Sequence, residues 1–136
     1  MNIRYPFLLG MANLLAGAFL VVATFAWPAS TTVDLGFAVS IGVVVFSLGL
    51  TAAALRGDVG WERSGVMAIG GLTALVASWT IVATQVFASG PAHWLVFASG
   101  LAHVGLSVAS LALHELSTER VVHHLEIRQE RHPVSA

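Results

Sequence analysis

The stretch that decides the fold is SGVMAIGGLTALVASWTIVATQVFASGPAHWLVFASGLAHVGLSVASLAL, residues 64–113, which contains no Asp, Glu, Lys or Arg. It is more than twice as long as the roughly 20 residues that one helix needs to cross a bilayer. The segment ASGPAHW, residues 88–94, interrupts it, because Gly90-Pro91 favours a turn and Trp94 favours the headgroup level. The stretch therefore predicts two membrane-spanning helices, at about residues 65–87 and 95–114.

Two further apolar runs precede this stretch, at about residues 7–27 and 35–55. The first ends at Trp27-Pro28 and is followed by ASTTVD, which we expect to be a polar loop, and the second is followed by the loop RGDVGWERSG. A signal peptide is the rival interpretation of the first run, but its apolar part is too long and FAWPAS is a poor cleavage site. We therefore expect an all-α, polytopic membrane protein with four transmembrane helices.

The composition supports this class. Hydrophobic residues make up 57% of the 136 residues, charged residues only 10%, and the mean hydropathy is +0.84. A soluble domain is about 25% charged. The chain has no cysteine, which excludes disulfides and thiolate metal sites, and no lysine, which excludes a Schiff base to retinal or pyridoxal phosphate.

The positions of the basic residues predict the orientation. All six are arginines, and they lie at the N-terminus, in the second loop and after the fourth run: Arg4, Arg56, Arg63, Arg120, Arg128 and Arg131. Arginine-rich segments stay on the cytoplasmic side. We expect both termini to be cytoplasmic, in the inner membrane of a bacterium whose GC-rich genome favours arginine over lysine.

Residues 115–136 form a polar tail. Val121, Val122 and Leu125 fall on one side of a possible short helix, which would lie along the membrane surface, and a solvated tail is the alternative. The pair His123-His124 could bind a metal weakly, but incidental histidines in a charged tail are the simpler interpretation.

The sequence contains an internal repeat, in which each of the two units is a helical hairpin. With a shift of 60 residues, Phe37-Ala38 aligns with Phe97-Ala98 and Ser47 with Ser107. The first spans align with a shift of 56, which pairs Met11-Ala12 with Met67-Ala68. Two-span units keep the same orientation, so this pattern predicts a parallel repeat about an axis along the membrane normal.

Two tandem two-helix units of this length resemble the SPW-repeat family of small bacterial integral membrane proteins. The motif of that family, Ser-Pro-Trp near the end of the first helix of each unit, is matched in degenerate form by Ala26-Trp27-Pro28 and Ala77-Ser78-Trp79. Gly42 and Gly70-Gly71 also fit the family's pattern. The resemblance covers about residues 8–114 and implies the four-helix architecture, without an activity or catalytic residues.

Polar side chains inside the spans are the candidate functional residues, because a buried polar group in lipid needs a partner. One lies on the first span, and five form a stripe within an arc of roughly 80° on the fourth span. These residues are Asn13, Ser99, His103, Ser107, Ser110 and His114. The stripe predicts that this face points into the bundle or toward a partner.

His103 allows three interpretations. It could be an axial haem ligand, with Met67 or a second copy of the chain supplying the other ligand, or it could belong to a proton path. It could instead hydrogen-bond to a facing polar group in a helix-packing seam, which is the interpretation that we prefer. His114, beside Glu115, would lie at the wet cytoplasmic interface. We predict no catalytic residue, no metal site and no bound cofactor.

Three functions stay open at the level of sequence. The first is a non-enzymatic structural or accessory module that packs against itself or within a larger membrane-protein complex. The second is a small transporter or channel, which usually carries an intramembrane carboxylate that is missing here. The third is a redox, quinone-binding or haem-binding protein that uses His103. The partners that we expect are the lipid bilayer and other membrane proteins, and no basic patch suggests nucleic acid.

Overall fold

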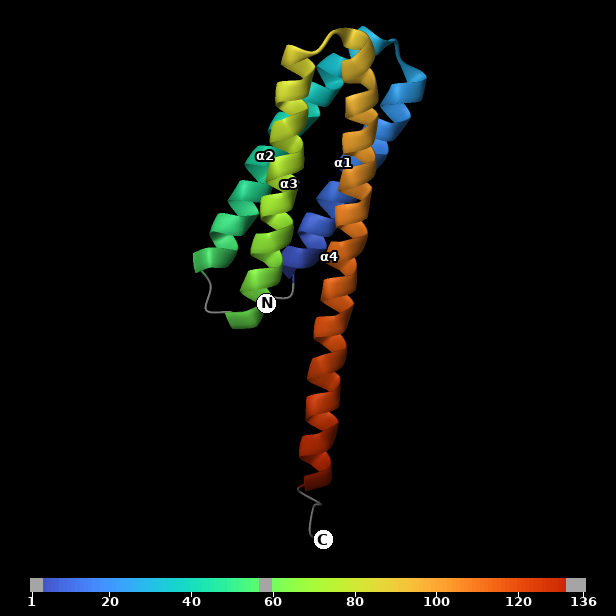
Figure 1. The fold of residues 1–136 in the computed structure, drawn as a ribbon. Helices are drawn as coiled ribbons and strands as arrows, with labels where there is room; N and C mark the ends of the chain where they lie inside the picture. The colour runs from blue at the N-terminus through green and yellow to red at the C-terminus, as the bar shows by residue number, and fades with distance from the viewer. Residues whose placement is uncertain (1–3, 57–59, 132–136) are drawn as a thin grey trace.

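The computed structural model describes residues 4–56 and 60–131, and it confirms the all-α fold with four helices. They are α1 (Arg4–Ala26), α2 (Ala29–Arg56), α3 (Gly60–Val86) and α4 (Ser89–Arg131). In Figure 1 the four helices form one elongated bundle with the two short turns at one end. The N-terminus and the α2–α3 connection lie toward the other end, from which α4 extends.

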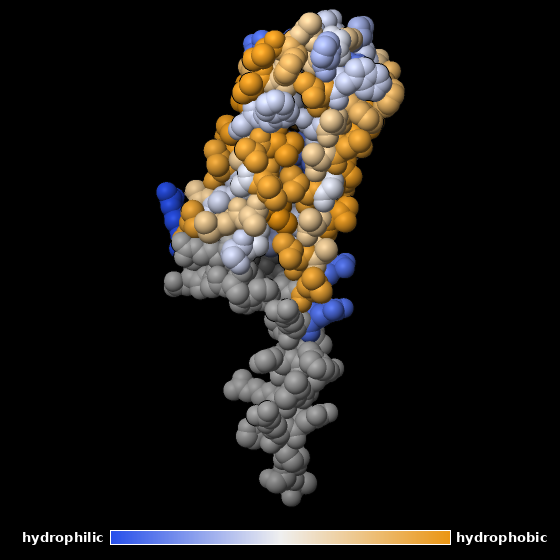
Figure 2. Space-filling view, viewed as in Figure 1, coloured by the Kyte–Doolittle hydropathy of each residue, from blue (hydrophilic) through white to orange (hydrophobic). Residues whose placement is uncertain are grey.

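Each helix contains a segment that is long and apolar enough to cross a membrane: Tyr5–Ala26, Ala29–Arg56, Ser64–Val86 and Ser89–Leu116. Apolar side chains cover the face of the bundle shown in Figure 2, with hydrophilic residues toward its two ends. The protein is therefore a multi-pass membrane protein whose outer surface meets lipid.

The turns at the upper end of the bundle are shorter than the sequence suggests. The segment ASTTVD is not a loop, because α2 begins at Ala29 and the amide of Thr32 already bonds to the carbonyl of Pro28. Gly90-Pro91 does not make the second turn either, since α4 begins at Ser89. Proline is tolerated in a first helical turn because its missing N–H has no helical partner there.

The second loop is also partly helical. Helix α3 begins at Gly60, so Trp61 lies in its first turn, and residues 57–59 of the expected loop fall outside the described residues. Asp34, which the sequence places in the first loop, is an exposed residue in the second turn of α2.

The polar tail is not a separate segment. Helix α4 runs through 43 residues, and Figure 1 shows that it leaves the bundle without a bend. The part beyond Leu116 adds 15 residues, or about 22 Å at 1.5 Å per residue. This continuous helix projects away from the bundle, whereas a separate helix along the membrane surface would need a break near the end of the fourth span.

The internal repeat is confirmed by the structure, but with one shift for the whole chain. Buried and exposed positions of α1 recur in α3, and those of α2 recur in α4, 60 residues later. The shift of 56 for the first spans is therefore wrong. Val22-Ala23-Thr24 and Val82-Ala83-Thr84 are the identities that reveal the correct register.

This register changes the comparison with the SPW motif. With the shift of 60, Trp79 is equivalent to Phe19 within α1. Trp27, in contrast, is equivalent to Phe87 in the connection between α3 and α4. The two degenerate motifs therefore occupy different places in their hairpins, and the family resemblance stays a prediction.

Each helix packs chiefly against a helix of the other hairpin. Helix α1 makes its most extensive contact with α4, and α2 does so with α3. At the crossing of α1 and α4 a side chain on Gly17 would lie 2.6 Å from the carbonyl oxygen of Gly100. Only glycine lets the two backbones approach so closely, so this pair fixes the depth at which the helices cross.

A pseudo-twofold axis relates the two hairpins. Two pairs of equivalent residues locate this axis, because the two members of each pair contact one another. Asn13 of α1 hydrogen-bonds to Thr73 of α3, and Gly36 of α2 lies against Val96 of α4. Equivalent points that touch must both lie beside the axis. One pair sits in the half of the bundle near the N-terminus and the other near the turns, so the axis runs along the bundle, as the expected parallel repeat requires.

Candidate functional site: a polar cluster at the centre of the bundle

The structure places the polar stripe of α4 on the inner face of the bundle. Ser99, His103, Ser107 and Ser110 are buried, and His114 is half-buried near the end of the span, with its ring centroid 6.2 Å from that of Phe7. Leu101, Val108 and Leu113 of α4 face outward instead, because apolar side chains can meet lipid without cost.

Asn13, Thr73 and His103 form a cluster at the pseudo-twofold axis. The Nδ2 of Asn13 lies 3.0 Å from the Oγ1 of Thr73, and its Oδ1 lies 2.8 Å from the Nδ1 of His103. The three side chains come from α1, α3 and α4, and none is more than 1% exposed. The cluster therefore ties three helices together at one depth. We call it the axial cluster.

The backbone of α1 determines how the Asn13 amide is oriented. Its Nδ2 also lies 3.0 Å from the carbonyl oxygen of Leu9, which can only accept a hydrogen bond. The NH₂ group must therefore face Leu9 and Thr73, and the amide oxygen must face His103. Because that oxygen is an acceptor, Nδ1 of His103 carries a hydrogen and donates it to Asn13.

This assignment leaves Nε2 of His103 as an acceptor within the bundle. No group among the described residues lies within hydrogen-bond distance of this atom. The hydroxyl of Ser107, one helical turn further along α4, is likewise without a partner in the part of the chain that the structure describes. Within the axial cluster, Nδ1 of His103 has a hydrogen-bond partner, whereas Nε2 has none among the described residues.

Two further polar contacts hold α4 in place. Ser99 accepts a hydrogen bond from Thr80 of α3 at 2.6 Å and donates to the carbonyl oxygen of Leu95 at 2.9 Å. Ser110 donates to the carbonyl oxygen of Pro6 on α1 at 2.5 Å. Hydrogen bonds between membrane helices contribute about 0.6 kcal/mol each on average. Together with the axial cluster they connect α4 to both neighbours along the span.

The geometry does not assemble the haem site considered from the sequence. Met67 is 43% exposed on the outside of α3, whereas His103 is fully buried, so Met67 is wrongly placed to be the second axial ligand within one chain. Among the described residues, no three His, Cys, Asp or Glu side chains lie together in a way that could hold a metal ion. The hydrogen bonds of the axial cluster connect α1, α3 and α4.

Sequence reasoning missed the partners of the stripe. Thr73 and Thr80 are ordinary threonines within an apolar run, and nothing in their local sequence indicates which helix they face. The correct repeat shift is the one available signal, because it makes Asn13 and Thr73 equivalent and thereby places both on one face. Pro6 contributes only a carbonyl oxygen, which no sequence pattern indicates.

Comparisons with known proteins give no relative. The chain matches no family model, no curated protein and no solved structure.

Proposed function

We propose that this protein is a non-enzymatic module of the membrane, which acts by packing α2 against a second membrane helix. That helix belongs to a second copy of the chain or to a larger membrane-protein complex. The observation that carries the proposal is an uncovered seam of small residues on α2.

The seam consists of five exposed residues of α2 that fall within an arc of roughly 80°: Ala38, Gly42, Val45, Gly49 and Ala52. A side chain added at Gly42 or Gly49 would meet no described atom within 4 Å, so both glycines face open space. Stripes of small residues are the surfaces at which membrane helices approach each other closely.

Helix α2 is also the least covered of the four helices. Only 11% of its apolar 18-residue stretch is buried inside the bundle, whereas the corresponding share is 39% in α1 and α3 and 33% in α4. Most buried polar side chains of the bundle hydrogen-bond to one another or to backbone carbonyl oxygens, which supports a role of the interior in folding rather than in chemistry.

We further propose the orientation in a bacterial inner membrane with both termini cytoplasmic. Arg4, Arg56 and the extension of α4 lie at the end of the bundle opposite the two short turns. The segregation of arginine to one end supports this orientation. A fluorescent-protein fusion after Ala136 should be bright if the C-terminus is cytoplasmic, and a periplasmic phosphatase fused there should be inactive.

Cysteine cross-linking tests the proposed interface, because the native chain has no cysteine. Val45 and Val108 are similarly exposed, at 67% and 62%, so Val45→Cys is the test variant and Val108→Cys its matched control. In native membranes Val45→Cys should give an oxidised dimer or an adduct with another membrane protein, and Val108→Cys should give neither.

A second variant distinguishes a specific seam from chance collisions. Gly42→Leu should abolish the cross-link at Val45→Cys, while Gly71→Leu, at an equally open glycine of α3, should leave it intact. If Val45→Cys yields no adduct and mild-detergent purification gives a monomer with lipid alone, the proposed function is wrong.

A further inference from the structure

Trp79 occupies an unusual depth for tryptophan. It lies seven residues before Val86, the end of its span, which is about 10 Å along the helix, and about 22 Å from Ser64 at the other end. Tryptophan in membrane proteins favours the two interfaces, where its N–H reaches water or headgroups. Trp79 therefore holds its indole N–H inside the hydrocarbon region.

No described residue accepts a hydrogen bond from the indole N–H of Trp79. The side chain is 52% exposed on the outside of the bundle. Since hydrocarbon offers no water at this depth, a molecule that approaches from the bilayer can supply the acceptor.

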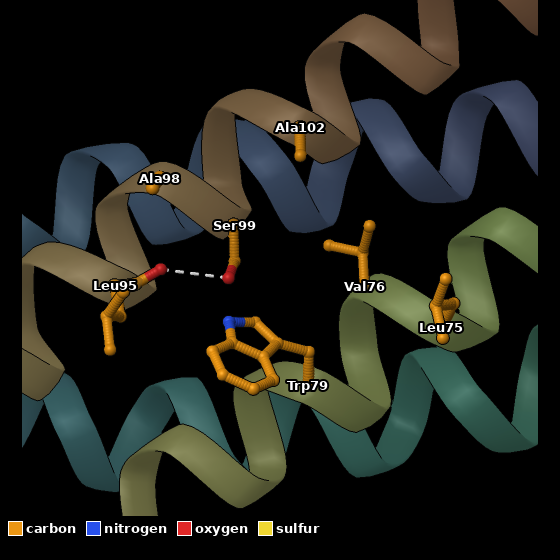
Figure 3. A pocket seen from close by; sticks show the side chains of 7 residues that line it. All are labelled: Leu75, Val76, Trp79, Leu95, Ala98, Ser99 and Ala102. Carbon is orange, nitrogen blue, oxygen red and sulfur yellow. Dashed lines mark hydrogen bonds between the residues drawn. The ribbon is translucent and has the colours of Figure 1, made fainter. Parts of the chain in front are cut away.

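A groove beside Trp79 can hold such a molecule. It has a volume of about 460 Å³ and lies between α3 and α4, lined by Trp79, Ser99 and five aliphatic side chains. Figure 3 shows the nitrogen-bearing edge of the Trp79 ring turned into the groove, toward Ser99. Ligand pockets of small molecules have volumes of roughly 300–1,000 Å³ and an apolar lining with a few convergent polar groups.

The first hairpin shows that the common fold does not need these two polar groups. The residue equivalent to Trp79 is Phe19, and the residue equivalent to Ser99 is Val39. Leu75 and Leu95, by contrast, are equivalent to Leu15 and Leu35, so the two leucines of the lining are shared. The second hairpin thus carries polar atoms at two positions, on different helices, that face the same groove.

From these observations we infer that the groove between α3 and α4 binds a lipid-soluble molecule with a carbonyl or similar acceptor oxygen on an apolar body. The oxygen accepts the hydrogen bond of the Trp79 indole, and the body lies against the aliphatic lining. Ser99 orients the site: its hydrogen is held by the carbonyl of Leu95 and its oxygen accepts from Thr80, so the wall beside the indole is fixed.

Nuclear magnetic resonance of the indole N–H gives a direct test in the full chain reconstituted in phospholipid nanodiscs. Trp27, Trp61 and Trp94 are replaced with phenylalanine, so that ¹⁵N-labelled Trp79 gives the single indole signal. The probes are decylbenzoquinone, which carries carbonyl oxygens, and decylbenzene, which has the same chain and a ring without an acceptor. A matched protein moves the reporter to the first hairpin through W79F and F19W.

Decylbenzoquinone should shift the Trp79 indole proton downfield with saturation, whereas decylbenzene should not. In the matched protein the half-saturating concentration should be at least about tenfold higher, which corresponds to about 1.4 kcal/mol. In the protein that retains Trp79, the additional substitution Ser99→Val should also raise the half-saturating concentration of decylbenzoquinone. The Trp79 signal of the protein with all four tryptophans serves as the check that the substitutions leave the fold intact.

Two results would overturn the inference. One is a linear shift of equal size in both proteins, which would mean that the probe merely dissolves in the bilayer. The other is a Trp79 indole that is already hydrogen-bonded in phospholipid alone and does not respond to the probe, which would assign the groove to ordinary lipid. Both results would leave the proposed interface at α2 untouched, because its test depends on different residues.

Discussion

Asn13 and Thr73 are equivalent positions of the two hairpins, and they hydrogen-bond to each other at 3.0 Å across the pseudo-twofold axis. Their chemistry differs although their places are the same, because one is an amide and the other a hydroxyl. The amide offers both a donor and an acceptor, so it can bind Thr73 and His103 together. The two hairpins therefore share a symmetric backbone, but their side chains differ at the axis, where Asn13 faces Thr73.

The first prediction concerns the hydrogen bond between Asn13 and His103. His103→Val introduces the residue that the first hairpin has at the equivalent position, Val43, and Asn13→Leu removes the other partner. A double-mutant cycle of these two substitutions should give a coupling energy of about 0.6 kcal/mol, with an upper bound of about 1.7 kcal/mol. The measurement is the free energy of unfolding in mixed micelles. Strictly additive effects would mean that the contact contributes nothing.

The second prediction concerns the glycine contact between α1 and α4. Gly17→Leu places a side chain against the backbone of Gly100, so the helices must separate, and the protein should lose about 1–3 kcal/mol of stability or more. Gly71→Leu is the matched control because a side chain at Gly71 meets no described atom within 4 Å. Thermal unfolding followed by circular dichroism measures both. Equal melting temperatures would contradict the close crossing.

The third prediction concerns the turn between α1 and α2. The hydroxyl of Thr32 donates to the carbonyl oxygen of Ala23 at 3.1 Å and lies 3.3 Å from that of Trp27, so it closes the end of α1. Thr32→Ala should cost about 1 kcal/mol and speed amide hydrogen exchange in the last turn of α1. Thr31→Ala, at an exposed neighbour, should do neither. Unchanged exchange in Thr32→Ala would exclude the capping role.

The fourth prediction concerns the pairing of each helix with the opposite hairpin. Two fragments, residues 1–58 and 59–136, should assemble in the membrane when they are produced together, because the main contacts of α1 and α2 are with α4 and α3. A tag on one fragment should recover the other, and Gly17→Leu should reduce that recovery. Fragments that never co-purify would show that the covalent link between the hairpins is needed for assembly.

Much of the fold could be predicted from the sequence, because the thickness of the bilayer sets the length of the apolar runs that became the four helices. The inward direction of the α4 stripe could be predicted too, since Ser99, His103 and Ser110 share one face of a helix. The predicted positions of the two turns were wrong. ASTTVD and Gly90-Pro91 are typical of loops in general, but here they lie at the start of α2 and α4, where a first helical turn tolerates them.

The partners of the stripe lay beyond sequence reasoning. A periodic pattern gives the face of a helix, but it does not say which helix lies opposite. That Asn13 meets His103 depends on the pairing of α1 with α4, and this pairing depends on backbone contacts such as that of Gly17 with Gly100. The shift of 56 for the first spans obscured the equivalence of Asn13 and Thr73, which was the one clue to the axial cluster.

The pairing of α1 with α4 has a consequence for biosynthesis. Helix α1 precedes α4 in the chain and has its main partner there, so Gly17 and the Oδ1 of Asn13 lack their α4 partners until α4 is inserted. We therefore expect the packing of α1 to be completed only after α4 is inserted, when His103 reaches Asn13. A chain that stalls before its fourth span would lack the hydrogen bond from His103 to Asn13, while Thr73 of α3 could already bind the Asn13 amide.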